Sequence, residues 1–237
     1  MANERQVGTL LAASLPGEVA GALIEGLGGM WMLDEPAEVV AEDLRLCHPD
    51  LGDGEVRVSV RPRQGSSRWR VTVVAADRPG LLAGTAAVLA SHGLSVDAAG
   101  ASTWVARGLA LHGVTVEDPG GHVSGAEAWA AIGDEIAAHL RAGTEPATEW
   151  KPGGRVKVVS TPVAGGRSVL RVEAPDRIGL LWVIASWLRD HACNLEAAQL
   201  SNQGGSAIDT FVVEGTVDAD ALVTHLAGRR RRLRRSA

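Results

Sequence analysis

Cysteine and long apolar runs are scarce in this 237-residue chain, and each of these two shortages excludes a class of protein. The two cysteines, Cys47 and Cys193, lie far apart and form no CxxC pair, so we expect reduced, buried thiols instead of a disulfide framework. No apolar run approaches the ~20 residues that span a membrane. The charged residues Glu4 and Arg5 stand before only a short apolar stretch, which makes a poor signal peptide. We therefore expect a cytoplasmic protein with no membrane partner.

Positive charge is also in short supply. The formal net charge is −5 at pH 7, and a body that binds nucleic acid needs a basic face to neutralise phosphates. The exception is the arginine-rich segment Arg229–Arg235. Two interpretations of this segment remain open: a site for nucleic acid or an acidic partner, or, more often, a solvated helix end. Nucleic acid is accordingly not an expected partner of the chain as a whole.

Patterns that support catalysis or metal binding are missing from the sequence. The seven histidines show no metal-ligand spacing, and no Ser/His/Asp or Cys/His arrangement has a supporting context. His92 and His191 occupy equivalent positions at the ends of two expected helices, where an imidazole interacts favourably with the helix dipole. We therefore expect a protein that is not an enzyme and that carries no cofactor and no metal.

Hydrophobic periodicity divides the chain into a helical segment over residues 1–53 and two mixed domains over 54–163 and 164–237. Apolar positions recur at helical spacing over residues 7–27, and Pro16-Gly17 interrupts this run, which predicts two short helices. A further helix is expected over 37–47. From residue 55 onwards the spacing changes to period two, which is typical of half-buried strands.

One stretch occurs twice and organises the two mixed domains. Aligned without a gap, residues 77–102 and 176–201 share 11 identities in 26 positions. In both copies an Asp-Arg-x-Gly-Leu-Leu turn follows a strand-like run and opens a helix-like run. Backbone N–H groups at such a helix start, together with the positive end of the helix dipole, favour a small anion such as a carboxylate.

The order of elements predicts an α+β fold made of two tandem ferredoxin-like βαββαβ units after the N-terminal helices. The second unit has no strand of its own after its last helix. We therefore expect the strand 155–161 to be the fourth strand of the first unit, and the strand 55–61 to complete the second unit and cover its open edge.

These residues resemble a known family, the ACT domain. The resemblance is carried by DRPGLL at the first turn and by HGLSV or HACNL at the start of the second strand of each unit. Two such units in tandem resemble the C-terminal regulatory part of the bacterial PII uridylyltransferase, and WMLDEPAEVVAEDLRLCHP is similar to the connector that precedes them. The catalytic motifs of that enzyme are not present in this chain.

The resemblance implies ligand sites between paired domains, against the first turn and the start of the second strand. In the first unit it points to Asp77, Arg78, Gly80, Leu81, Leu82, Asp97, Ala98 and Ala99. In the second unit it points to Asp176, Gly179, Leu180, Leu181, Asn194, Glu196, Ala197 and Ala198. The copies differ, since Ser95 stands where the second unit has Asn194, and Ile178 replaces the proline of the motif.

What the resemblance implies about function is allosteric sensing of a small amino acid, glutamine first. The expected protein is a non-catalytic regulator that binds this ligand through ACT domains, forms a homodimer and relays occupancy to a regulated protein partner. The alternative is an interaction or oligomerisation module whose ACT pockets are degenerate and bind no ligand.

Overall fold

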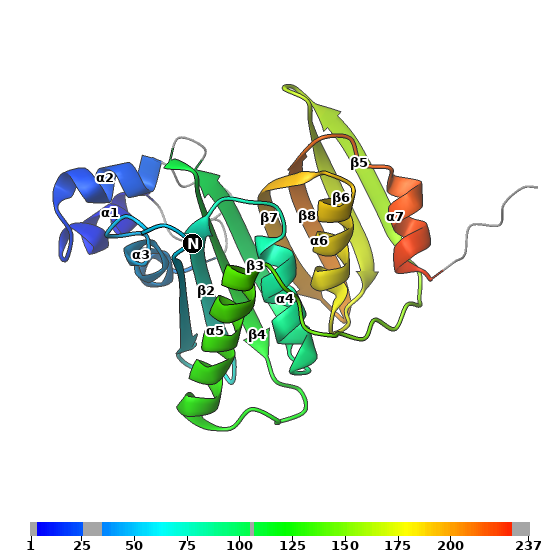
Figure 1. Ribbon diagram of the computed structural model, residues 1–237, viewed down its shortest axis with the longest axis horizontal. Coiled ribbons are helices and arrows are strands. Elements are labelled where there is room, and N and C mark those ends of the chain that lie inside the picture. The colour runs from blue at the N-terminus through cyan, green and yellow to red at the C-terminus, as the bar shows by residue number, and fades with distance from the viewer. Residues whose placement is uncertain (1–3, 26–34, 105–106, 229–237) are drawn as a thin grey trace, which may run out of the picture.

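A computed structural model describes residues 4–25, 35–104 and 107–228 of the chain. Its centre is one antiparallel sheet of eight strands in the order β1-β2-β4-β3-β7-β8-β6-β5 (Figure 1). The α+β class with two ferredoxin-like units is confirmed. The arginine-rich segment 229–235 and the first part of the expected connector lie outside the described residues.

The sheet consists of two halves with the same succession of elements. The first half contains β1 (Val56–Pro62), β2 (Trp69–Ala76), α4 (Leu81–Ser91), β3 (Ser95–Trp104), β4 (Leu109–Glu117) and α5 (Gly125–Ala142). The second contains β5 (Lys157–Val163), β6 (Arg167–Pro175), α6 (Leu180–Asp190), β7 (Asn194–Gln203), β8 (Ser206–Glu214) and α7 (Ala219–Leu226). We call these halves the first and second repeat.

The expected exchange of edge strands is wrong. Residues 56–62 pair only with β2 of their own repeat, and residues 157–163 pair with β6 of the second repeat. Each repeat therefore runs ββαββα, and its edge strand precedes the other strands in sequence instead of following them. The physical reason is the short connection in each case, because adjacent strands joined by a short loop form a hairpin at little entropic cost. The division into three domains otherwise stays a prediction.

The two repeats join through β3 and β7, a pairing that we call the seam. Gly100 of β3 lies opposite Gln199 of β7, and these two residues are equivalent positions of the repeat. An antiparallel pairing centred on equivalent residues relates the repeats by a local two-fold axis. Every feature near the seam consequently has a counterpart on its other side.

One face of the sheet carries α4, α5, α6 and α7 over a shared hydrophobic core (Figure 1). The opposite face of the first repeat is covered by α1 (Glu4–Ala12), α2 (Gly17–Glu25) and α3 (Ala37–Arg45). As a result β4 is buried along almost its whole length, whereas β6 and β8 alternate between buried and less buried positions. Two short helices before residue 26 and a third after residue 36 agree with the sequence. None of the helices in the described parts of the chain meets the length and hydropathy needed to cross a membrane.

Candidate ligand-binding site at the seam

The two repeated turns share one backbone geometry. Gly80 and Gly179 stand directly before α4 and α6 with φ of 93° and 88°, in the left-handed region that glycine adopts at little cost. No side chain caps either helix start. Each turn therefore presents a helix N-terminus, with its positive dipole end, towards the space beside the seam.

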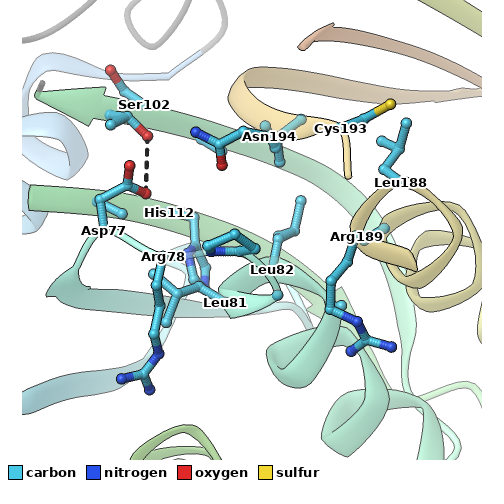
Figure 2. Close-up of a pocket in the computed structure, with 18 of the residues that line it drawn as sticks. Asp77, Arg78, Leu81, Leu82, Ser102, His112, Leu188, Arg189, Cys193 and Asn194 are labelled. Carbon is cyan, nitrogen blue, oxygen red and sulfur yellow. Dashed lines mark hydrogen bonds between the residues drawn. The ribbon is translucent and has the colours of Figure 1, made fainter. Parts of the chain in front are cut away.

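The first turn closes a pocket together with the second repeat. The pocket is lined by residues 77–83, by the C-terminal part of α6 and by residues 193–195 at the start of β7. Figure 2 shows Asn194 on β7 above Leu82, with Asp77 to one side and Arg189 of α6 to the other. We call this the first pocket.

The second turn forms the matching pocket on the other side of the local two-fold axis. The turn residues Asp176, Arg177 and Gly179 and the first residues of α6 lie there with Leu94, Val96 and Asp97, where β3 of the first repeat begins. Each pocket therefore lies between the repeats and takes its turn from one repeat and its strand start from the other, whereas the sequence analysis grouped each turn with the strand start of its own unit. We call this the second pocket.

This geometry regroups the expected site residues. Asp77, Arg78, Gly80, Leu81 and Leu82 share the first pocket with Asn194, which the sequence had paired with the second turn. Asp176, Gly179, Leu180 and Leu181 share the second pocket with Asp97.

The remaining expected residues line neither pocket. Ala98 and Ala99 pair with Ser201 and Leu200 across the seam, and Ala197 and Ala198 pair with Ser102 and Ala101. Glu196 lies 3.6 Å from the guanidinium of Arg167. The four alanines therefore join the repeats, and Ala98 and Ala99 line a separate pocket with Glu35 and Arg70, whereas Glu196 pairs within the second repeat.

Sequence reasoning missed a pair of buried titratable side chains that line the pockets at equivalent positions. His112 on β4 lines the first pocket, where its Nε2 lies 2.9 Å from the hydroxyl of Thr85. Asp209 on β8 lines the second pocket. Burial lowers the pKa of His112 to about 3, with the positive charge of Arg70 adding to the effect. Burial and then the nearby carboxylate of Asp176 raise the pKa of Asp209 to about 7.

The aspartates that open the two turns are held differently. Asp77 accepts a long hydrogen bond, 3.5 Å, from the side-chain hydroxyl of Thr103 and a further one from the backbone of Arg78, and burial raises its pKa. Asp176 accepts a hydrogen bond of 2.5 Å from the side-chain amide of Asn202, and burial followed by the charge of Asp97 raises its pKa. The carboxylate of Asp77 is thus the more available of the two for a ligand.

Two arginines border the first pocket with different roles. Arg78 donates to the carbonyl oxygen of Leu140 near the end of α5, and Figure 2 shows its guanidinium directed away from Asn194. Arg189 lies against the turn, because a β-carbon added at Gly80 would stand 3.0 Å from its Cδ. Its guanidinium pairs with Glu145 on the segment that links the repeats. Arg189 therefore partly covers the first pocket.

The chain is similar in sequence to part of a larger enzyme. It is 28% identical over 223 residues to the bifunctional uridylyltransferase/uridylyl-removing enzyme of Burkholderia vietnamiensis, covering 90% of this chain and 26% of the relative. The enzyme of the same name from Burkholderia thailandensis is 27% identical over 224 residues, with the same coverage of 90% and 26%. The predicted resemblance to the uridylyltransferase is confirmed, and the chain spans about a quarter of the length of these relatives.

No family model matches the chain. Among solved structures, aspartate kinase from Synechocystis gives a TM-score of 0.41 at 14% identity, over 66% of this chain and 26% of that one. In the described parts of the chain no group of three or more His, Cys, Asp or Glu side chains is arranged to hold a metal ion.

Proposed function

We propose that the chain is a non-catalytic regulatory protein that senses a small amino acid, glutamine first, in the first pocket. The observation that carries the proposal is the placement of Asn194 of one repeat beside the open turn of the other. The backbone N–H groups at the start of α4 would bind the ligand carboxylate, and Asp77 would accept from its ammonium group. Asn194 would exchange hydrogen bonds with a side-chain amide, since a carboxamide both donates and accepts.

The similarity to uridylyltransferase/uridylyl-removing enzymes over 90% of the chain supports a regulatory role linked to nitrogen supply. The position of the pocket suggests how occupancy is relayed. A ligand there contacts both repeats at once, so its binding favours one arrangement of α6 against the first turn. A protein partner that recognises this arrangement would read the signal, and a homodimer is the assembly that we expect to present it.

The second pocket is less suited to the same ligand. The negative charges of its carboxylates, Asp97, Asp176 and Asp209, would repel a ligand carboxylate. Asp176 also already accepts a hydrogen bond from the side chain of Asn202. The position equivalent to Asn194 is Ser95, which does not line the second pocket. We therefore assign sensing to the first pocket alone.

Ligand entry requires Arg189 to move. The first pocket has a cavity of about 40 Å³, which holds a few water molecules but not an amino acid. Displacing Arg189 from the first turn would enlarge the cavity, and the ion pair between Arg189 and Glu145 on the linking segment would change with it. This coupling gives the linking segment a part in the response.

We expect glutamine to raise the melting temperature of the chain in a thermal-shift screen of the twenty amino acids. A ligand at ~100 times its Kd stabilises the folded state by about 2.7 kcal/mol. Asn194→Ser, which installs the residue type found at position 95, should remove most of this shift because it deletes the amide that reads the ligand. The melting temperature without ligand should stay nearly unchanged.

The matched control is Asn202→Thr, which changes the other asparagine of β7 to the residue type at position 103. Because Asn202 lines the second pocket, the glutamine shift should persist in this variant. A shift lost in Asn202→Thr and kept in Asn194→Ser would place the ligand in the second pocket. No shift with any amino acid at millimolar concentration would overturn the sensor and leave the interaction module as the function.

A further inference from the structure

A further concavity, much larger than the first and second pockets, lies on the helix side of the second repeat. It has a volume of about 710 Å³ and is bounded by α6, by α7 along its length and by the segment that links the repeats. We call it the α6–α7 groove. Its volume is in the range of pockets that bind sizeable ligands.

The groove exists because the two repeats differ in their last helix. In the first repeat α5 has 18 residues, and it packs so closely on α4 that a β-carbon at Gly84 would stand 2.8 Å from Leu140. In the second repeat α7 has only 8 residues, and the residue equivalent to Gly84 is Val183, which lines the groove. A surface that the first repeat covers with its own helix is therefore left concave in the second.

The lining of the groove combines aromatic rings with carboxylates. Three tryptophans contribute to it, Trp150, Trp182 and Trp187, and Trp187 stacks on His191 with ring centroids 3.8 Å apart. Four carboxylates line it with a single guanidinium, that of Arg189, which pairs with Glu145 and Asp190. Asp218 accepts from the backbone N–H of Ala221, and the fourth carboxylate is that of Asp220. Indole rings beside negative charge favour guanidinium groups, which stack on aromatic faces and pair with carboxylates.

Two polar atoms in the groove also lack a partner. The indole N–H of Trp150 and the hydroxyl of Ser186 are buried, and neither forms a hydrogen bond within the described residues. A buried donor without an acceptor is unfavourable. A peptide backbone lying in the groove would supply carbonyl oxygens to both groups.

The chain itself carries a segment of matching chemistry that begins beside the groove. Residues 229–235 contain six arginines and one leucine. The preceding Gly228 lies against Pro152, since a β-carbon there would stand 2.5 Å from the proline Cγ, and Pro152 is two residues from Trp150 of the groove wall. Seven residues span up to ~24 Å, more than the ~12 Å length of α7, so the segment can reach every wall of the groove.

We infer that the α6–α7 groove is a docking site for the arginine-rich segment 229–235 of the same chain. The arginines lie against the tryptophans and carboxylates, and the leucine contributes apolar contact. Docking in this way keeps six positive charges from nucleic acids and acidic proteins, while an acidic competitor for the segment would release it. The inference does not rest on amino-acid binding in the first pocket, although Arg189 lines both that pocket and the groove.

The test uses a chain that ends at Gly228 and a synthetic peptide of residues 229–237. The peptide should bind the shortened chain, followed by tryptophan fluorescence and by calorimetry, and raising the salt concentration should weaken binding. The complete chain should bind the same peptide at least tenfold more weakly, because its tethered segment competes at a high effective concentration. Asp220→Asn in the shortened chain should weaken peptide binding about fivefold, the upper range for an exposed ion pair.

The matched control is Asp134→Asn, which removes an exposed carboxylate of α5 outside the groove and should leave the peptide affinity unchanged. Failure of the peptide to bind the shortened chain would overturn the inference. Equal peptide affinity for the shortened and complete chains would show that the groove is free in the complete chain, which also overturns it. A complete chain that sediments as a dimer when the shortened chain is a monomer would assign the groove to the segment of a second copy.

Discussion

Asp43→Ala is expected to lower the free energy of unfolding by about 3–5 kcal/mol. Asp43 lies on α3 and is fully buried, and its carboxylate accepts hydrogen bonds from Thr72 at 2.6 Å and from Arg70 at 2.7 and 3.2 Å. It also pairs with Arg61. Removing the carboxylate leaves the guanidinium of Arg70, which is 3% exposed, short of a main partner in a site that water does not reach. The cost is large because a buried charge loses compensation.

Chemical denaturation of the wild type and the variant measures this difference. The matched control is Glu42→Ala, which removes the neighbouring carboxylate on α3 that pairs with Arg61 but is 52% exposed. An exposed pair of this kind contributes at most about 1 kcal/mol. If Asp43→Ala lowered the free energy of unfolding no more than Glu42→Ala does, the contacts of Asp43 with Arg61 and Arg70 would contribute little to holding α3 on the sheet.

The internal repeat made the general fold readable from the sequence. The Asp-Arg-x-Gly-Leu-Leu turns mark where each strand passes into a helix, and the period-two valines mark the strands around them. The same repeat led to the wrong edge strands, because its pattern says that the strands 55–61 and 155–161 are equivalent without saying which neighbour each one joins. Pairing depends on loop closure, and the short connections to β2 and β6 decide it.

The candidate site was harder to predict for a related reason. Most of the residues that the resemblance implied do line a pocket. Asn194, however, lies beside the turn of the first repeat, which is more than a hundred residues earlier in the chain. That grouping follows from the antiparallel pairing of β3 with β7, which local sequence does not encode. His112 and Asp209 were missed although one signal was present, since a titratable side chain stands at the same matched position inside both strands.

His112 and Asp209 are expected to give opposing contributions to the pH dependence of stability. The pKa of Asp209 is raised from 3.8 to about 7, so between these values the folded state holds a proton that the unfolded state has released. Stability from this group therefore falls as pH rises, by up to about 1.4 kcal/mol per pH unit. The pKa of His112 is lowered from 6.5 to about 3, so the unfolded state binds the extra proton and stability from this group rises with pH. Between about pH 4 and 6.5 the two slopes cancel.

Single substitutions should reveal each slope. At pH 4 the Asp209→Asn variant should unfold with nearly the wild-type free energy, because both side chains are then neutral. At pH 8 it should be more stable than the wild type by up to about 4 kcal/mol, because the variant has no charge to bury. His112→Gln should show the opposite trend: relative to the wild type, its free energy of unfolding should increase as pH falls from 7 to 4. The changed contact with Thr85 should lower its free energy of unfolding by about 1 kcal/mol at every pH.

Urea denaturation at several pH values measures these differences. Subtracting the free energy of unfolding of the wild type from that of each variant cancels the contributions of the titrating groups that the two share. Glu127→Gln, on the exposed first turn of α5, provides the control and should track the wild type at all pH values. Parallel curves for wild type and Asp209→Asn would mean that water reaches the Asp209 carboxylate in the folded protein. The second pocket would then be more open than its lining indicates, and Asp209 would carry a negative charge there at neutral pH.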